Sequence, residues 1–482
     1  MTRSIYARSV LLGVVLVAIS IPLFGQERSA PRGETGRFAH APSLNLDLLH
    51  KRWGRSFPVA RGCRWEDYRL NAPPAGEDRT DGPSSDRRGT IGDALDVAAG
   101  DNGVCGPTIF LAAGTYFEGQ LEISKPTVIV GEPGVVIIGG IRNTTGAPMW
   151  LQTFAMRNAP VPGALIVSHP QADSMVIGVD ISNASGFGVV HHGGRLEAWN
   201  LNVDGTRATP LTLNLGATVS SASGRSGDPG RYALGSWLAG RAARREVMGA
   251  GLIKRIKTML SLERLPAAEL DLCSGTGLFA SGGAYVELYN TSFSFNEAAG
   301  LAARGFGTWV NAFSLGAALN GFAAAWSNFI SGEAAADSSA CFGGVDIADH
   351  ALLLGQGGSI FANAGVGLFV RRAVAGFAAL SAGQTAGSQD SFGIGDDVVV
   401  YQLGFISLSD QFSLIGADRT GLLLENSSGN AIDGTISAER FGIVLQHGSS
   451  LYRSNVEFSG GEQDILTDGD LEVPQPPPVP QQ

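Results

Sequence analysis

The chain has 482 residues, and 44% of them are hydrophobic, which excludes an intrinsically disordered protein. The formal net charge of −10 and the pI near 5.2 argue against a nucleic-acid partner, whose phosphates such a chain would repel. The length exceeds that of one compact core, but a stacked repeat can reach it because each unit buries itself on its neighbours.

The N-terminus carries the features of a secretory signal. Arg3 and Arg8 precede an apolar run over residues 10–24, which predicts a signal peptide over residues 1–25. A retained membrane anchor is the alternative, but the run is shorter than the ~20 residues needed to span a bilayer, and Pro22 interrupts it. We therefore expect a secreted, periplasmic or cell-surface protein of a bacterium, with no transmembrane span once the signal is removed.

Two further segments are predicted to lack regular structure. Residues 26–87 are polar and rich in Pro and Arg, and they are expected to form an irregular linker region. Residues 467–482 contain repeated prolines, which cannot pair as a strand, and they are expected to form a disordered tail.

Regular structure is predicted to begin near Thr90. Over residues 90–100 the apolar side chains fall on one helical face, and Gly100 stands where a C′ glycine would end the helix. From residue 108 to 139 the pattern changes to short β-runs separated by Gly and Pro. A short helix followed by regular short strands predicts a cap and its first coils.

The rest of the chain repeats with a period near 22 residues. Turn glycines followed by alternating apolar residues recur at Gly277, Gly300, Gly321, Gly344, Gly365, Gly393, Gly421 and Gly442, spaced 21 to 28 residues apart. In residues 163–205 equivalent positions are separated by 22 residues. A period of two inside a period near 22 predicts an all-β right-handed parallel β-helix, a solenoid over residues 88–466, in which stacked coils bury apolar residues that one coil could not.

One segment breaks this repeat. Residues 222–270 begin as Gly- and Ser-rich sequence and continue with a helical apolar stripe and the one basic stretch of the chain. We expect a helical insertion in one coil. It could dock on a membrane or an acidic glycan, but an amphipathic helix packed against the solenoid is favoured.

The cap helix, the turn at residues 114–118 and the 21–28-residue coils resemble the pectin-lyase-like superfamily of right-handed parallel β-helices. The resemblance covers roughly residues 88–466. It implies the architecture and leaves the activity open, because that superfamily includes lyases, hydrolases, esterases, epimerases and adhesins.

Four cysteines, Cys63, Cys105, Cys273 and Cys341, suit disulfides in an exported chain. Pairing of sequence neighbours, Cys63 with Cys105 and Cys273 with Cys341, is favoured, and buried free thiols are the alternative.

No complete catalytic motif is found. Asp396-Asp397 and the Arg255 to Lys257 pair loosely match polygalacturonase-like members, but their chain order is wrong, and adjacent carboxylates on a strand point to opposite faces. Acidic residues do not share one column, as a Ca²⁺ site would require. No cofactor is evident, and Ca²⁺ is the candidate ion that the resemblance implies.

The best candidate binding residues are columns of His and Asp or Asn. At an offset of 22, His169 aligns with His191, followed by His192, while Asp180 aligns with Asn202 and Ser182 with Asp204. Stacked imidazoles on one face could bind a sugar or a metal, although exposed histidines without such a role are common. We select His169, His191, His192, Asp180, Asn202 and Asp204 as candidate substrate-binding residues.

The sequence thus favours an exported, non-catalytic β-helix protein that binds a polysaccharide or another cell-envelope component. The alternative is a polysaccharide lyase or glycoside hydrolase that acts on an acidic polysaccharide. The oligomeric state is left open.

Overall fold

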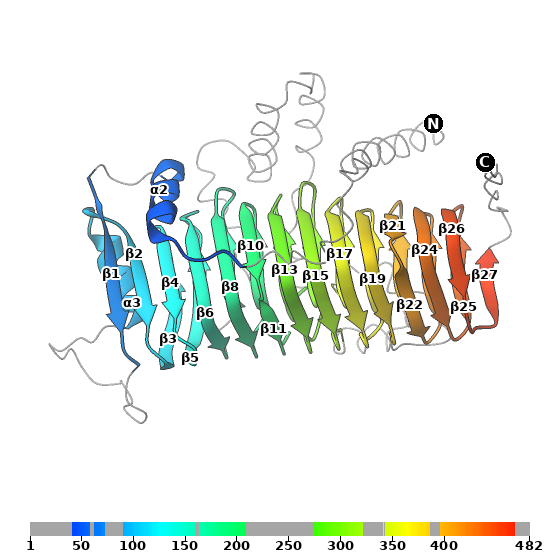
Figure 1. Ribbon diagram of the computed structural model, residues 1–482, viewed down its shortest axis with the longest axis horizontal. Helices are drawn as coiled ribbons and strands as arrows, with labels where there is room; N and C mark the ends of the chain where they lie inside the picture. The colour runs from blue at the N-terminus through cyan, green and yellow to red at the C-terminus, as the bar shows by residue number, and fades with distance from the viewer. Residues whose placement is uncertain are drawn as a thin grey trace, which may run out of the picture. The chain divides into compact units, whose positions relative to one another are not determined.

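The computed structural model describes residues 41–57, 62–72, 90–159, 163–208, 273–321, 341, 343–385 and 396–467. Residues 47–482 form one compact unit. Its described strands pair in parallel throughout, and the fold is a right-handed parallel β-helix, as the repeat predicts. In Figure 1 the successive coils lie side by side from β1 to β27.

Three faces surround the core of the solenoid, and each is a stack of parallel strands. Face A contains β1 (Arg64–Leu70), β2 (Val104–Leu111), β4 (Thr127–Gly131), β10 (Arg195–Trp199), β21 (Phe405–Ser409) and the first halves of β6 (Met149–Arg157), β8 (Asp173–Ser182), β13 (Tyr285–Ser294), β15 (Trp309–Ala318), β17 (Leu352–Phe361), β19 (Val374–Gly383), β24 (Ser428–Ala438) and β26 (Ser450–Phe458). Face B contains the second halves of those long strands, β11 (Asn202–Asp204), β22 (Phe412–Ala417) and the starts of β3 (Gly114–Glu122) and β5 (Val135–Asn143).

Face C contains the ends of β3 and β5 and a series of shorter strands. These are β7 (Gly163–Ser168), β9 (Phe187–His192), β12 (Thr276–Ser281), β14 (Leu301–Arg304), β16 (Val345–Ala348), β18 (Val366–Arg371), β20 (Asp396–Tyr401), β23 (Thr420–Glu425), β25 (Phe441–Gln446) and β27 (Gln463–Thr467). Outer side chains of face C, such as Phe279 and Phe369, are buried. Faces A and B therefore offer the accessible outer surfaces.

The long strands turn from face A to face B at one residue in the left-handed region. In adjacent coils this residue is Asn290 (φ 51°), Ser314 (φ 60°), Gly357 (φ 64°) and Ala379 (φ 56°). A single residue with positive φ reverses the inside-outside alternation locally, so the strand bends without losing its pairing. Asn and Gly suit this position because they tolerate that conformation at least cost.

The corner between faces B and C holds a buried asparagine ladder, formed by Asn296, Asn320 and Asn363. Asn296 Nδ2 donates to Asn320 Oδ1 at 2.9 Å, and Asn320 Nδ2 donates to Asn363 Oδ1 at 3.0 Å. The same oxygens accept the backbone N–H groups of Asn296 and Asn320. The ladder thus satisfies polar backbone in the interior at the point where each coil turns.

The cap helix is α3 (Ile91–Gly100), whose buried residues Ile91, Ala94, Leu95 and Ala98 are those predicted. Thr90 and Asp93 form a capping box at its start. Residues 114–118, expected to form a turn, begin strand β3 instead. Glu118 of that strand accepts the N–H of Ile91 at 2.7 Å, which places a carboxylate at the positive end of the helix. Gly100 is the last helical residue, not the residue beyond the helix, because the chain continues extended at Asp101.

The region assigned to an irregular linker contains regular structure, and the boundary at residue 88 is wrong. Helix α2 (Leu46–Ser56) lies there, and β1 pairs with β2 as the first strand of face A. The His50 and Trp65 rings stack at 3.9 Å, and Trp53 is buried beside them. Alternation in β1 is hard to recognise because its outward positions carry Trp, Asp and Arg in a polar context.

Coil lengths vary at the corner between faces B and C. Gly300 and Gly344 occupy equivalent positions in adjacent coils, so Gly321 does not begin a coil. The residue equivalent to Gly344 in the following coil is Gly367, not Gly365. In the coil after that, the equivalent residue is Asp397. Strands β9 and β12 pair across residues 189 and 278, so the extra chain that includes residues 222–270 enters within one coil, after β11.

Two disulfides are present, Cys63–Cys105 and Cys273–Cys341. The first joins the start of β1 to β2, and the second joins the residues before β12 to those before β16. The predicted signal peptide, the helical character of residues 222–270 and the proline-rich segment after residue 467 lie outside the described residues.

Candidate functional site

Three of the residues selected from the sequence lie on the outer surface of face B. Asp180, Asn202 and Asp204 are exposed, and Asn202 Nδ2 donates to Asp180 Oδ1 at 2.7 Å. The next strand extends both columns, since Ser292 Oγ donates to Asn202 Oδ1 at 2.7 Å and Ser294 Oγ donates to Asp204 Oδ1 at 3.0 Å. This exposed polar row bonds mainly to itself.

The three selected histidines do not join that row or each other. Val167, not His169, pairs with His191, because the offset on face C is 24 residues. The turn between β7 and β8 is two residues longer than the turn between β9 and β10, and the offset returns to 22 on faces A and B. The predicted histidine column is therefore wrong.

Each histidine has its own environment. His191 points into the core, where burial and the neighbouring His192 lower its pKa to about 3. His192 lies on the outer side of face C, with Nδ1 2.9 Å from Ser281 Oγ. His169 follows β7 and accepts the N–H of Gln171 at 3.1 Å. No shared imidazole site results from this placement.

The acidic pair Asp396-Asp397 is buried on β20, and its proposed partners Arg255 and Lys257 lie outside the described residues. Burial raises the pKa of Asp397 to about 7, a hydrogen bond from Thr385 Oγ1 at 2.8 Å opposes this rise, and Asp396 adds to it. Across the described parts of the chain, no group of three or more His, Cys, Asp or Glu residues is placed to hold a metal ion.

A different group of side chains gathers on the outer surface of face A. Strands β10, β13 and β15 read Arg195-Leu-Glu-Ala-Trp199, Tyr285-Val-Glu-Leu-Tyr289 and Trp309-Val-Asn-Ala-Phe313. Their middle apolar residues point into the core, so the alternation of the strand turns the other residues outward. We call the outward set the aromatic–carboxylate patch, and it comprises Asp173, Arg195, Glu197, Trp199, Tyr285, Glu287, Tyr289, Trp309, Asn311 and Phe313.

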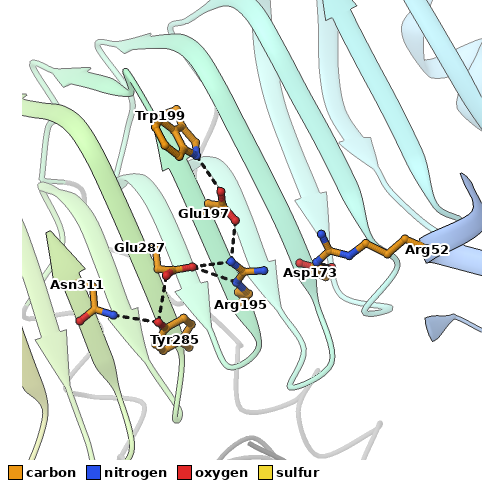
Figure 2. Close-up of polar contacts among 8 residues, drawn as sticks. All are labelled: Arg52, Asp173, Arg195, Glu197, Trp199, Tyr285, Glu287 and Asn311. Carbon is orange, nitrogen blue, oxygen red and sulfur yellow. Dashed lines mark hydrogen bonds and ion pairs between the residues drawn. The ribbon is translucent and has the colours of Figure 1, made fainter. Parts of the chain in front are cut away.

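Arg195 is at the centre of a continuous polar network in this patch (Figure 2). Its Nη2 atom contacts Glu197 Oε2 at 2.7 Å and Glu287 Oε2 at 2.6 Å. The two carboxylates face one another in register on adjacent strands. Burial alone would lower the pKa of Arg195, but hydrogen bonds and charge from Glu287, with the charges of Glu197 and Asp173, raise it. The guanidinium thus holds two like charges together.

The other carboxylate oxygens are also engaged. Trp199 Nε1 donates to Glu197 Oε1 at 2.9 Å, and the Tyr285 hydroxyl donates to Glu287 Oε1 at 3.1 Å (Figure 2). Burial and Glu287 raise the pKa of Tyr285, so this hydroxyl stays protonated and remains a donor.

Asn311 extends the network to β15. Its Nδ2 atom donates to the Tyr285 oxygen at 2.9 Å, and its Oδ1 atom accepts from Trp309 Nε1 at 2.8 Å. At the opposite end, Arg52 of α2 pairs with Asp173 of β8 at 2.6 Å (Figure 2).

The aromatic rings of the patch form a stacked column. Trp199 and Tyr289 lie 3.9 Å apart between centroids, nearly parallel, and Tyr289 and Phe313 lie 5.0 Å apart at 6°. Tyr285 and Trp309 meet edge to face at 5.9 Å. Burial, with the charges of Glu287 and Glu197, raises the pKa of Tyr289 to about 12. Each such pair stabilises the protein by about 0.5–1.5 kcal/mol beyond its buried area.

The patch is suited to binding more than to proton transfer. All four oxygens of Glu197 and Glu287 already accept hydrogen bonds. Hydrolysis of a glycosidic bond needs one carboxyl that donates a proton and another that attacks or activates water. Glu197 and Glu287 would have to leave Arg195 before either could do so.

Sequence reasoning missed this patch although its signal is present. The three segments share the pattern polar or aromatic, apolar, polar, apolar, aromatic. They are separated by 90 and 24 residues, so a search at an offset of 22 does not align them.

Comparison with known proteins finds only distant likenesses. No protein-family model and no curated protein sequence matches the chain. Among solved structures, a catalytic domain of a GH87 α-1,3-glucanase in complex with nigerose is 13% identical with a TM-score of 0.30, covering 84% of this chain and 68% of that one. A pectin methylesterase from Aspergillus niger is 12% identical with a TM-score of 0.18, covering 87% of this chain and 93% of that one. These values are too low to transfer either activity. In the part of the chain that is described, no helix has the length and apolar character to cross a membrane.

Proposed function

We propose that the protein is an exported, non-catalytic β-helix that binds a neutral glycan on face A. The single observation that carries this proposal is the aromatic–carboxylate patch, where aromatic rings and a continuous polar network share one outer surface. Sugars combine apolar ring faces with many hydroxyl groups. Aromatic surface combined with a few fixed polar groups is the usual composition of a small-molecule site.

The charge of the patch favours a neutral ligand over an acidic one. Asp173, Glu197 and Glu287 carry three negative charges, against two positive charges on Arg52 and Arg195. Both guanidinium groups are already paired with carboxylates. An anionic polymer would meet a net negative surface on a protein of charge −10. This weighs against a lyase or hydrolase that acts on an acidic polysaccharide at this patch.

Export rests on the predicted signal and on the two disulfides. Disulfides form and persist in oxidising compartments, such as the periplasm and the exterior of the cell. Their presence supports a location where the protein can bind glycans of the cell envelope or the surroundings.

The test is a binding survey of neutral and uronic-acid polysaccharides by affinity electrophoresis and calorimetry. Asn311→Ala is compared with Asn430→Ala, which changes a residue in the same outward column farther along face A. We expect Asn311→Ala to weaken binding of a neutral glycan about fivefold or more and Asn430→Ala to leave it unchanged. Failure to bind any neutral glycan would overturn the proposal. New reducing or unsaturated ends in an incubated polysaccharide would overturn its non-catalytic part.

A further inference from the structure

The stacked column of the patch ends at Phe313. Its members Trp199, Tyr289 and Phe313 occupy equivalent positions on adjacent strands. In the following coils the same column continues with Gln356, Ala378 and Ser409. The change from ring to non-ring side chain therefore falls between β15 and β17.

Phe313 is unusual among the rings of the column. It is 40% exposed, whereas Trp199 is buried and Tyr289 is half-buried. One ring face packs on Tyr289, and the other is directed toward the position of Gln356. A large apolar ring with one face turned toward an exposed, flexible side chain is the kind of surface that a ligand can cover.

Room for a ligand lies beyond Gln356. Its side chain is exposed and can swing aside, and the next position of the column is Ala378. In the neighbouring outward column Leu354 is followed by Gly376, which carries no side chain. Beyond Gln356 and Leu354 of β17, these two outward columns therefore continue with small residues on β19 and β21.

We propose, building on the proposed function, that a pyranose ring stacks on the free face of Phe313 as the next member of the column. Coil spacing of about 4.8 Å places successive rings at stacking distance, so a sugar ring parallel to Phe313 extends the existing geometry. Such stacking suits a pyranose whose hydroxyl groups are equatorial, because both of its ring faces then present C–H groups and either face can cover Phe313. The ligand class is a neutral equatorial hexose polymer.

Polar groups flank this position on both sides. Asn311 lies two residues before Phe313 on the same outward side, and its amide retains one further donor and one further acceptor position beyond its two hydrogen bonds. Gln356 supplies a second amide. Together they can bond to hydroxyl groups at the rim of a stacked ring.

The experiment measures binding of cellohexaose and chitohexaose by calorimetry to the full chain and to Phe313→Ala, Phe313→Trp and Gln356→Ala. The control is Tyr452→Ala, which removes a 50% exposed ring from the same face in the last coil. We expect Phe313→Ala to weaken binding about tenfold, Phe313→Trp to retain it, and Gln356→Ala to weaken it about threefold. Tyr452→Ala should change nothing. Circular dichroism verifies that each variant is folded.

The outcomes separate this inference from the proposed function. If Asn311→Ala weakens binding while Phe313→Ala does not, the patch binds a glycan but the ring position is wrong. Equal weakening by Phe313→Ala and Tyr452→Ala also overturns the ring position. If the unmodified protein binds no neutral glycan, both proposals fail.

Discussion

The asparagine ladder and the exposed polar row have the same construction in two environments. In both, an amide or hydroxyl of one coil donates to an oxygen of the adjacent coil at 2.7–3.0 Å. Asn296, Asn320 and Asn363 are buried, whereas Asp180, Asn202 and Asp204 face water. Repetition of a polar residue from coil to coil therefore does not by itself mark a binding site. Burial decides whether the repeated hydrogen bonds contribute much or little to the free energy of unfolding.

The largest expected effect is on the asparagine ladder. Asn320→Ala removes side-chain hydrogen bonds to Phe293 O and Asn363 Oδ1. It also takes the acceptor from the buried backbone N–H of Asn296, whose Nδ2 atom then keeps only Val203 O at 3.4 Å. We expect a loss of about 3 kcal/mol in the free energy of unfolding, measured by urea denaturation. A loss below about 0.5 kcal/mol would mean that burial is not what distinguishes the two rows.

The second prediction concerns His191, a buried group whose titration makes the stability of the protein depend on pH. The pKa of His191 is about 3 in the folded protein, below its ordinary value of 6.5, so the unfolded chain gains a proton first. The stabilising effect of the neutral ring is complete above pH 6.5 and is lost as the pH falls toward 3, by about 1.4 kcal/mol per pH unit. His191→Leu should remove this part of the pH dependence of unfolding.

The control for His191 is an exposed histidine. His447 is paired with Glu425 at the surface, and its side chain is 63% exposed. His447→Asn is measured beside His191→Leu as the control for removing a histidine from the surface. If both variants change the slope equally, the interior position of His191 is not its cause.

The third prediction concerns Asp397, whose contribution to stability falls as the pH rises, opposite to that of His191. The pKa of Asp397 is about 7 when folded and 3.8 ordinarily, so the folded state holds its proton more tightly. Stability from this group is therefore present below pH 3.8 and declines as the pH rises to 7. At pH 8 Asp397→Asn should raise the free energy of unfolding by about 2 kcal/mol, and at pH 3.5 it should have little effect. A variant that is less stable at pH 8 would contradict this sign.

The smallest effect is expected for the exposed polar row. Asn202→Ala removes hydrogen bonds to Asp180 and Ser292 on a surface where water replaces them. We expect a change within about 0.5 kcal/mol in thermal or urea unfolding. A loss comparable to that of Asn320→Ala would remove the distinction between the two rows.

Much of the fold could be predicted because its signals are local. The period of two within a coil, the amphipathic helix at residues 91–100 and the turn glycines each follow from a few neighbouring residues. The number of coils was harder to predict. The sequence spacing suggested two coils between residues 300 and 344, but these residues are equivalent in adjacent coils, so the distance is one coil. Strand β1 was missed because no regular coil precedes it.

The candidate site was harder to predict than the fold. His169 and His191 share an offset of 22 in sequence, but a turn two residues longer moves His169 out of the strand. The members of the aromatic–carboxylate patch, in contrast, meet only because extra chain between β11 and β12 leaves the register of β10 and β13 intact. Sequence spacing does not show which segments are inserted between the strands of a coil. The pairing of the strands in the structure shows which residues are equivalent.

The asparagine ladder lies at the corner where the length of the coils changes. Residues 209–272, 322–340 and 386–395, outside the described residues, begin shortly after Thr206, Asn320 and Thr385. The N–H of Thr206 donates to Asn296 of the ladder, Asn320 is itself a member of the ladder, and Thr385 Oγ1 donates to Asp397. In these three coils a hydrogen bond to another coil or strand therefore lies close before the segment that is outside the described residues. The corner between faces B and C is therefore where successive coils differ in length by up to about 20 residues, while the strands on either side of it keep their parallel pairing.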